Sequence, residues 1–343
     1  MSEEFRKLTG KAVRYMIPLA VSAGLLLWLF HKVDFKEMMA VIREGCDFRY
    51  IVIMMLITAL SHVIRGVRWG IQLRGAGVPR MPVIAESVSI FGAYALNLVF
   101  SGVGEAWRCI YVSRRESVPL STVVGTDIGD RISDAIVVLA LFGVALVVAH
   151  GPLTDFMSHY VMGKDLAHFS ENPWLWCAMA LAIVVVVTLF HFFKKYRYID
   201  KIDEGLKNVW HGFKVMFIMK GAGRYVILTL CIWVCYFMET YVCFYAFPFT
   251  RRFVTEPGTA FGLIPGLVVF VFGSFSMAVP SNGGLGPWNL AVMFALSIYG
   301  VSNTEGAAFS MVMWGFQAIM LILLGIFSAV YVTCTKRKLV SSK

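Results

Sequence analysis

Charged side chains inside apolar stretches are the residues of this sequence that could do chemistry. Glu105 and Arg108 lie three positions apart, directly after two glycines, so on a helix they could contact each other. A second charged group follows at Asp127, Asp130, Arg131 and Asp134. Guanidinium groups bind phosphate in a bidentate geometry, so this set indicates binding of a phosphate-bearing ligand.

Two further apolar segments carry charge. His62, Arg65 and Arg68 recur at one-turn spacing on one helix face. We expect Arg65 to point into a cavity, whereas Arg68 either does the same or reaches out to the level of the lipid phosphates. Glu239 is the lone carboxylate of its segment and has no cation within a turn of its own helix. It is either a proton-coupling group or a protonated structural acid bonded to a neighbouring helix.

The composition is that of an integral membrane protein. Of the 343 residues, 58% are hydrophobic and 15% are charged, and the mean hydropathy is +0.72. A soluble domain usually carries about a quarter charged residues. The net charge of +10 comes from Lys and Arg beside apolar segments and in one central loop, which indicates membrane orientation and not nucleic-acid binding. The seven cysteines have no metal-ligand spacing, so we expect neither a metal nor a cofactor.

Six apolar segments are long enough to cross a bilayer core about 30 Å thick. They are residues 12–31, 50–70, 131–150, 172–193, 224–247 and 305–333. The loop 194–224 is rich in Lys and Arg and the loop 151–171 holds only Lys164, which predicts that the first is cytoplasmic, the second external and both termini cytoplasmic. Apolar residues at helical spacing within 194–224 predict an amphipathic helix, lying either on the inner membrane surface or against the bundle.

Two apolar regions, 84–118 and 258–300, are interrupted, and each must begin and end on one side of the membrane. We therefore expect two helical hairpins that are re-entrant in at least their second arms, because those arms are too polar or too short to cross. The glycines that could form the hairpin turns are Gly102, Gly104, Gly283, Gly284 and Gly286. Glycine permits the unusual dihedrals of a chain reversal, although small residues also let membrane helices pack closely.

The two interrupted regions match each other at a constant offset of 181 residues. Residues 91–96 align with 272–277, Gly102 with Gly283, and Trp107 with Trp288. In the predicted topology the units 50–150 and 224–333 are related by inversion, as in many alternating-access transporters. The predicted fold class is an all-α polytopic membrane protein. It is a single membrane domain over 1–343, with about six full transmembrane helices and two re-entrant or broken helical hairpins in an inverted repeat.

Three short motifs together resemble a known family. They are Asn97, Gly104, Glu105 and Arg108, then Asp130, Arg131 and Asp134, and finally Pro280, Gly283, Gly284, Leu285 and Gly286. With these three motifs in this order, the chain resembles the flippase-like family related to the transmembrane domain of lysylphosphatidylglycerol synthases. The resemblance implies a protein of the bacterial cytoplasmic membrane that moves or handles lipid. Some members of that family are linked to lysyl-phospholipid exposure, and others to polyprenyl-linked or envelope glycolipids.

The chain departs from the family pattern at two positions. Ser101 stands where a proline is frequent, and Asn289 stands where many members have a glutamate, which puts an acid role there in doubt. Only about ten residues follow the last predicted span, so we expect no soluble aminoacyl-transferase domain and no complete lysyl-lipid synthase.

The leading hypothesis is a lipid translocase that moves a phospholipid or a polyprenyl-phosphate-type lipid. The predicted substrate-binding residues are Arg65, Asn97, Glu105, Arg108, Arg131 and Asn282, and the predicted coupling or charge-pairing residues are Asp130, Asp134 and Glu239. The expected partners are a membrane lipid with an anionic head group and either a second copy of the chain or a separate lipid-modifying enzyme. Two alternatives stay open: an intramembrane enzyme acting on lipid head groups, for which the sequence has no nucleophile or metal constellation, and a scaffold for envelope assembly.

Overall fold

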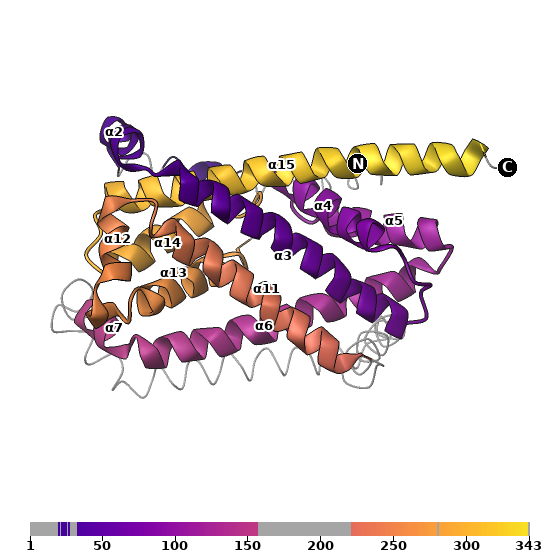
Figure 1. Ribbon diagram of the computed structural model, residues 1–343, viewed down its shortest axis with the longest axis horizontal. Coiled ribbons are helices and arrows are strands. Elements are labelled where there is room, and N and C mark those ends of the chain that lie inside the picture. Colours follow the sequence, from indigo (N-terminus) through magenta and orange to yellow (C-terminus); the bar gives the residue numbers. More distant parts are fainter. Residues whose placement is uncertain are drawn as a thin grey trace, which may run out of the picture.

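The computed structural model describes residues 20, 22–25, 27, 33–156, 221–279 and 281–341. Every regular element in this part of the chain is a helix, which confirms the all-α class (Figure 1). The helices are α2 (Phe35–Gly45), α3 (Phe48–Gly75), α4 (Val83–Val99), α5 (Val103–Glu116), α6 (Leu120–Val148), α7 (His150–Phe156), α11 (Ala222–Cys243), α12 (Pro248–Thr255), the 3-10 turn η2 (Pro257–Thr259), α13 (Leu263–Ser276), α14 (Pro287–Ser297) and α15 (Asn303–Ser341).

Four of these helices are long and apolar enough to cross a membrane: α3, α6, α11 and α15. The shortest of them, α11, has 22 residues and rises about 33 Å at 1.5 Å per residue, slightly more than a bilayer core. The chain is therefore a multi-pass membrane protein. The predicted spans 12–31 and 172–193, and the predicted amphipathic helix at 194–224, lie wholly or mostly outside the described residues.

The start of α6 corrects one predicted boundary. The sequence predicts a span from residue 131 because charged residues precede it, but α6 begins at Leu120, directly after Pro119. Proline fixes a backbone angle that suits a helix start, and the charged side chains that follow find partners on neighbouring helices. The acids of this group therefore lie inside a long helix and not in its lead-in.

The first hairpin consists of α4, a three-residue turn and α5. Gly102 forms the turn with a φ of 78°, which favours glycine. Gly104 does not belong to the turn, which corrects the prediction: it lies in the first turn of α5, where an added Cβ would collide with the carbonyl oxygen of Ala93 on α4. Its role is to let the two arms approach closely.

The second hairpin consists of α13, a longer loop over 277–286, and α14. Gly283, Gly284 and Gly286 all have positive φ angles, of 58°, 81° and 93°. Pro280, the proline of the third motif, lies outside the described residues. Helix α14 starts at Pro287, and the Asn289 side chain accepts a hydrogen bond of 3.1 Å from the Gly286 N–H.

The two hairpins share one internal contact. In the first, the ring of Trp107 on α5 packs against Gly92 on α4, so closely that a Cβ there would overlap it. In the second, Trp288 on α14 packs against Gly273 on α13, although with the Nε1 edge of its indole. Both pairs are matched by the offset of 181 residues, so the aligned positions also make equivalent contacts.

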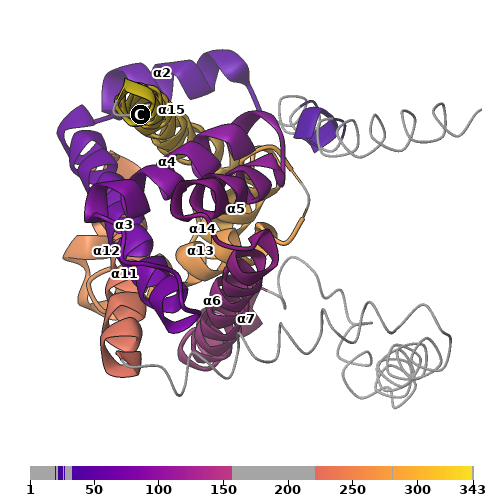
Figure 2. The same cartoon turned by 90° about the vertical axis from the view of Figure 1, so that its right-hand side faces the viewer.

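The hairpins lie toward opposite ends of the long helices. In Figure 1, α13 and α14 gather at the left end beside α12, whereas α4 and α5 lie to the right, and Figure 2 shows the α4–α5 end in front of α13 and α14. Helix α15 runs along both, packing on α4 and α14, while α3 packs on α11 and α4. The hairpin tips meet between them, because Gly283 packs directly against Leu98.

Candidate functional site

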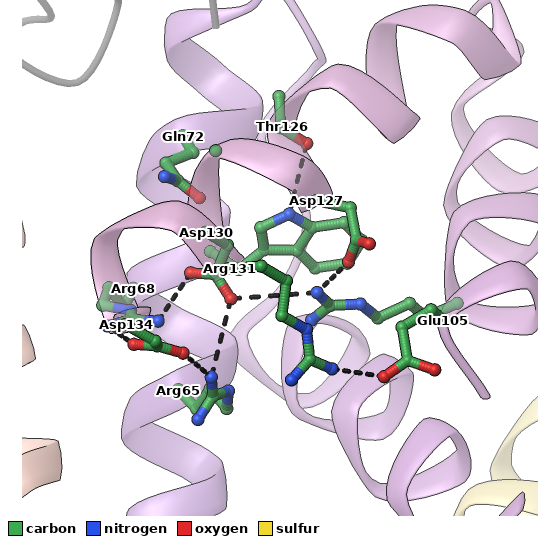
Figure 3. Close-up of polar contacts among 12 residues, drawn as sticks. Arg65, Arg68, Gln72, Glu105, Thr126, Asp127, Asp130, Arg131 and Asp134 are labelled. Atoms are coloured by element: carbon green, nitrogen blue, oxygen red, sulfur yellow. Dashed lines mark hydrogen bonds and ion pairs between the residues drawn. The ribbon is translucent and has the colours of Figure 1, made fainter. Parts of the chain in front are cut away.

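Helix α6 carries a row of charged side chains that face α3 and α5 (Figure 3). Each of them pairs with a charge on a neighbouring helix. The pairs are Asp127 with Arg108, Asp130 with Arg68, Asp134 with Arg65 and with Arg68, and Arg131 with Glu105. Four arginines thus meet four carboxylates, so the cluster is balanced in charge.

The α3 side of this cluster is a buried network. Arg68 is fully buried and bridges two carboxylates, with its Nη2 2.7 Å from Asp130 Oδ1 and its Nη1 2.8 Å from Asp134 Oδ1. Arg65 pairs with Asp134 and also donates a 2.7 Å hydrogen bond to the Tyr236 hydroxyl. Arg68 therefore neither reaches out to lipid phosphates nor lines the cavity, so both roles left open by its position in the sequence are replaced by a place in the buried network.

Arg108 fastens α5 to α6. Its side chain is 0% exposed, pairs with Asp127 and stacks over the Trp69 ring at 4.5 Å. Arg108 does not form the ion pair with Glu105 that their spacing of three residues allows. Glu105 instead turns to α4 and α6, because Asn97 and Arg131 offer it partners there.

Glu105, Asn97 and Arg131 form the most accessible part of the cluster. The Asn97 amide donates to both carboxylate oxygens of Glu105 at 3.0 Å, and its own oxygen accepts from the Gly104 N–H at 2.8 Å. Arg131 approaches Glu105 from α6 with a side chain that is 40% exposed, and Glu105 is 27% exposed. This ion pair can therefore exchange a partner at lower cost than the buried pairs, since exposed pairs contribute little to stability.

A cavity of about 530 Å³ opens between the two hairpin tips. Several predicted residues line it: Arg65, Asn97, Gly102, Glu105, Arg131, Asp134, Glu239, Gly283 and Gly284. Others do not: Gly104, Arg108, Asp130, Asn282 and Gly286. Asn282 lies in the loop of the second hairpin, where its backbone N–H donates to the Ser22 hydroxyl at 3.2 Å.

The cavity wall combines charged and apolar side chains. Besides the arginine–carboxylate pairs and Glu239, most of its lining residues are aromatic or aliphatic. They include Val138, Trp233, Val269, Phe270, Met277, Trp288, Met313, Trp314 and Leu321. The site can therefore hold a molecule with a polar head and an apolar body.

Glu239 lines the same cavity, but its hydrogen bonds go to neutral side chains and not to the arginines. Its Oε2 accepts a 2.7 Å hydrogen bond from the Gln317 amide, and its Oε1 accepts from the Ser61 hydroxyl at 3.4 Å. Within the described residues it forms no ion pair. Its neighbours thus bond the carboxyl group without neutralising it.

Comparison with known proteins identifies the family of this chain. The pattern of the family described as the lysylphosphatidylglycerol synthase TM region matches residues 15–325. The chain belongs to this family. No curated protein and no solved structure matches the chain.

Membership in the lysylphosphatidylglycerol synthase TM family confirms the resemblance and associates the chain with the handling of membrane lipid. The family description names a lipid and a transmembrane region, and it names no substrate for this chain. Of the motif residues that carried the resemblance, Asn97, Glu105 and Arg131 meet at one point. Arg108 and Asp130 lie behind them in the buried network.

Sequence reasoning missed the neutral part of this site. Tyr94, Trp233, Tyr236, Trp314 and Gln317 all line the cavity, but aromatic and amide residues are common in membrane helices and carry no signal of their own. Trp233 has a second distinction, because its buried indole Nε1 has no hydrogen-bond partner among the described residues. A buried donor without a partner beside a cavity is suited to bind a polar group of a ligand.

Proposed function

We propose that this chain is a lipid translocase that moves a lipid with an anionic, phosphate-bearing head group across the bacterial cytoplasmic membrane. A phospholipid or a polyprenyl-phosphate-type lipid fits this description. The observation that carries the proposal is the amphipathic cavity between the hairpin tips, which is lined both by arginine–carboxylate pairs and by many aromatic and aliphatic side chains. A lipid likewise combines a charged head with an apolar body, and membership in a family named for the transmembrane region of a lipid synthase supports the proposal.

Arg131 is the arginine best placed to receive the phosphate. It lines the cavity, is 40% exposed, and pairs with a single carboxylate. When the phosphate replaces Glu105 on Arg131, Glu105 keeps two hydrogen bonds from the Asn97 amide, so the displaced carboxylate is not left without partners. Arg65, held by Asp134 and Tyr236, supplies a second positive charge to the cavity wall.

The repeat supports transport more than catalysis. Aligned positions make the same glycine–tryptophan contact in both hairpins, and the hairpins approach each other from opposite ends of the bundle (Figure 1). In our proposal they are re-entrant hairpins of an inverted repeat that enter from opposite membrane surfaces, with both termini in the cytoplasm. The lipid then passes between their tips by alternating access, with no covalent step.

The test is lipid flipping in proteoliposomes that contain fluorescently labelled phosphatidylglycerol, read by loss of fluorescence when a membrane-impermeant reductant is added. Charge-assisted hydrogen bonds contribute about 1.5–3 kcal/mol each, so Arg131→Ala is expected to slow flipping roughly 10- to 100-fold. The matched control is Arg114→Ala, since Arg114 is an exposed arginine of α5 that does not line the cavity. Equal rates for the wild type and both variants would contradict the proposal.

A further inference from the structure

A buried carboxyl group lies in the cavity with a role that phosphate binding does not explain. Glu239 is 4% exposed, faces the cavity from near the C-terminal end of α11, and is bonded only by neutral donors among the described residues. An ionised carboxylate kept from water is costly unless a cation pairs with it. Arg65, the arginine of α3 that lines the cavity, already pairs with Asp134 and donates to Tyr236.

A small polar network surrounds Glu239 and is separate from the arginine cluster. The Ser61 hydroxyl lies 3.4 Å from Glu239 Oε1, 3.2 Å from the Nδ1 atom of His62 and 2.8 Å from the Thr58 carbonyl oxygen, so its single hydrogen is shared between two acceptors. That Nδ1 is also 2.7 Å from the Thr58 carbonyl oxygen, which can only accept, so Nδ1 carries a hydrogen. In a neutral ring the Nε2 atom is then an acceptor, and it is buried without a hydrogen-bond partner in the described part of the chain.

The titratable and charged groups that face this network come from several helices. They are His62 and Arg65 on α3, Tyr94 on α4, Asp134 on α6, and Cys235, Tyr236 and Cys243 on α11. Helix α13 has no ionisable residue, and α15 contributes the neutral Gln317. Asp134 is neutralised by two arginines, so Glu239 is the cavity carboxyl whose charge has no built-in counterpart.

Helix α15 connects Glu239 to the second hairpin. Gln317, which donates to Glu239, and Trp314, which donates a 2.8 Å hydrogen bond to the Gly283 carbonyl, lie three positions apart and so share a helix face. A protonated carboxyl group donates from one oxygen and keeps the other as an acceptor, so the hydrogen bond at the protonated oxygen must reverse or change partner. Protonation of Glu239 therefore alters its bond to Ser61 on α3 or to Gln317 on α15, and the Gln317 bond lies next to the contact that holds the tip of the second hairpin.

We propose that Glu239 is a proton-binding site that couples proton movement to the position of the second hairpin. The carboxylate takes up a proton from water that reaches the cavity from one side of the membrane and releases it to the other side as the hairpin moves. The coupling rests on the proposed lipid transport, whereas proton binding by Glu239 does not. An experiment can therefore contradict the coupling and leave the proton-binding site standing.

The first test is infrared spectroscopy of the protein in lipid nanodiscs during a pH titration. We expect the difference between the wild type and Glu239→Gln to contain the C=O band of one carboxylic acid that appears and disappears with pH while the protein stays folded. Gln317→Ala leaves the acid in place but removes a donor, so it should change the frequency and the titration of this band. A Glu239 band that does not change with pH, or that Gln317→Ala leaves unaltered, would overturn the proposal.

The second test is flipping of labelled phosphatidylglycerol in proteoliposomes with an imposed pH gradient. Wild type and Glu256→Gln, an exposed acid changed to its amide, should respond to the gradient, whereas Glu239→Gln should flip at a rate that no longer depends on it. Trp314→Phe should keep the infrared band and lose the dependence on the gradient. A gradient response that survives in Glu239→Gln or in Trp314→Phe, or a rate that follows Na⁺ and not pH, would overturn the coupling. A titrating band without any flipping would instead leave the proton site standing and contradict the transport function.

Discussion

The two hairpins have the same plan and opposite chemistry. The first is fastened by charge: Arg108 and Glu105 tie α5 to α6, and Arg74 on α3 pairs with the buried Glu86 of α4 at 2.7 Å. The second has no charged residue at all, since residues 257–304 contain no Asp, Glu, Lys, Arg or His. Its tip is a loop with three glycines at positive φ, held by neutral contacts such as the bond from Trp314.

This difference assigns separate tasks to the two halves. Buried ion pairs break only at a cost of several kcal/mol, so the first hairpin is suited to hold a fixed binding geometry. Neutral packing and a glycine loop can rearrange without leaving a charge unpaired, so the second hairpin is the one suited to move. Two hairpins that were chemically alike would have no such division.

The largest effect is expected at Arg108. Removal of one partner of a buried ion pair typically costs about 3–5 kcal/mol, so Arg108→Ala should lower the free energy of unfolding by roughly that amount, with Arg114→Ala as the exposed control. Denaturant unfolding in detergent micelles measures the change. The double variant Arg108→Met, Asp127→Asn should recover part of the loss, because neither partner is then left charged and alone. A loss below about 1 kcal/mol for Arg108→Ala would show that charge does not fasten the first hairpin.

A smaller and equal effect is expected at the glycines that face the two tryptophans. Gly92→Ala and Gly273→Ala each force a methyl group against a packed ring, which should cost about 1–3 kcal/mol in unfolding experiments. Trp107→Ala should relieve only the first and Trp288→Ala only the second. If one of the two glycines tolerates alanine without loss, the hairpins do not share this contact and the structural basis of the repeat is weakened.

The sequence revealed the positions that break local rules. Glycines at Gly102 and Gly283 interrupt apolar segments, and charges such as Glu239 stand where lipid or packing would favour apolar residues, so both classes were visible without a structure. The all-α class and the family followed from the same kind of observation.

The partners of the charges could not be read in the same way. Whether Glu105 pairs with Arg108 on its own helix or with Arg131 on α6 depends on how the helices are rotated, and the spacing within one helix does not contain that rotation. For the same reason Arg108, a predicted substrate contact, lies buried against Trp69 away from the cavity. Neutral lining residues such as Trp233 were missed because nothing in their type distinguishes them from packing residues.

In the proposed function, a lipid phosphate binds Arg131 between the hairpin tips. The most direct test of this binding is mass spectrometry of the lipid that copurifies with the protein in mild detergent. We expect the wild type and Arg114→Ala to retain the same phosphate-bearing lipid, and Arg131→Ala to retain roughly tenfold less of it, because one charge-assisted contact is lost. The same lipid in equal amount on Arg131→Ala would show that Arg131 does not bind the phosphate.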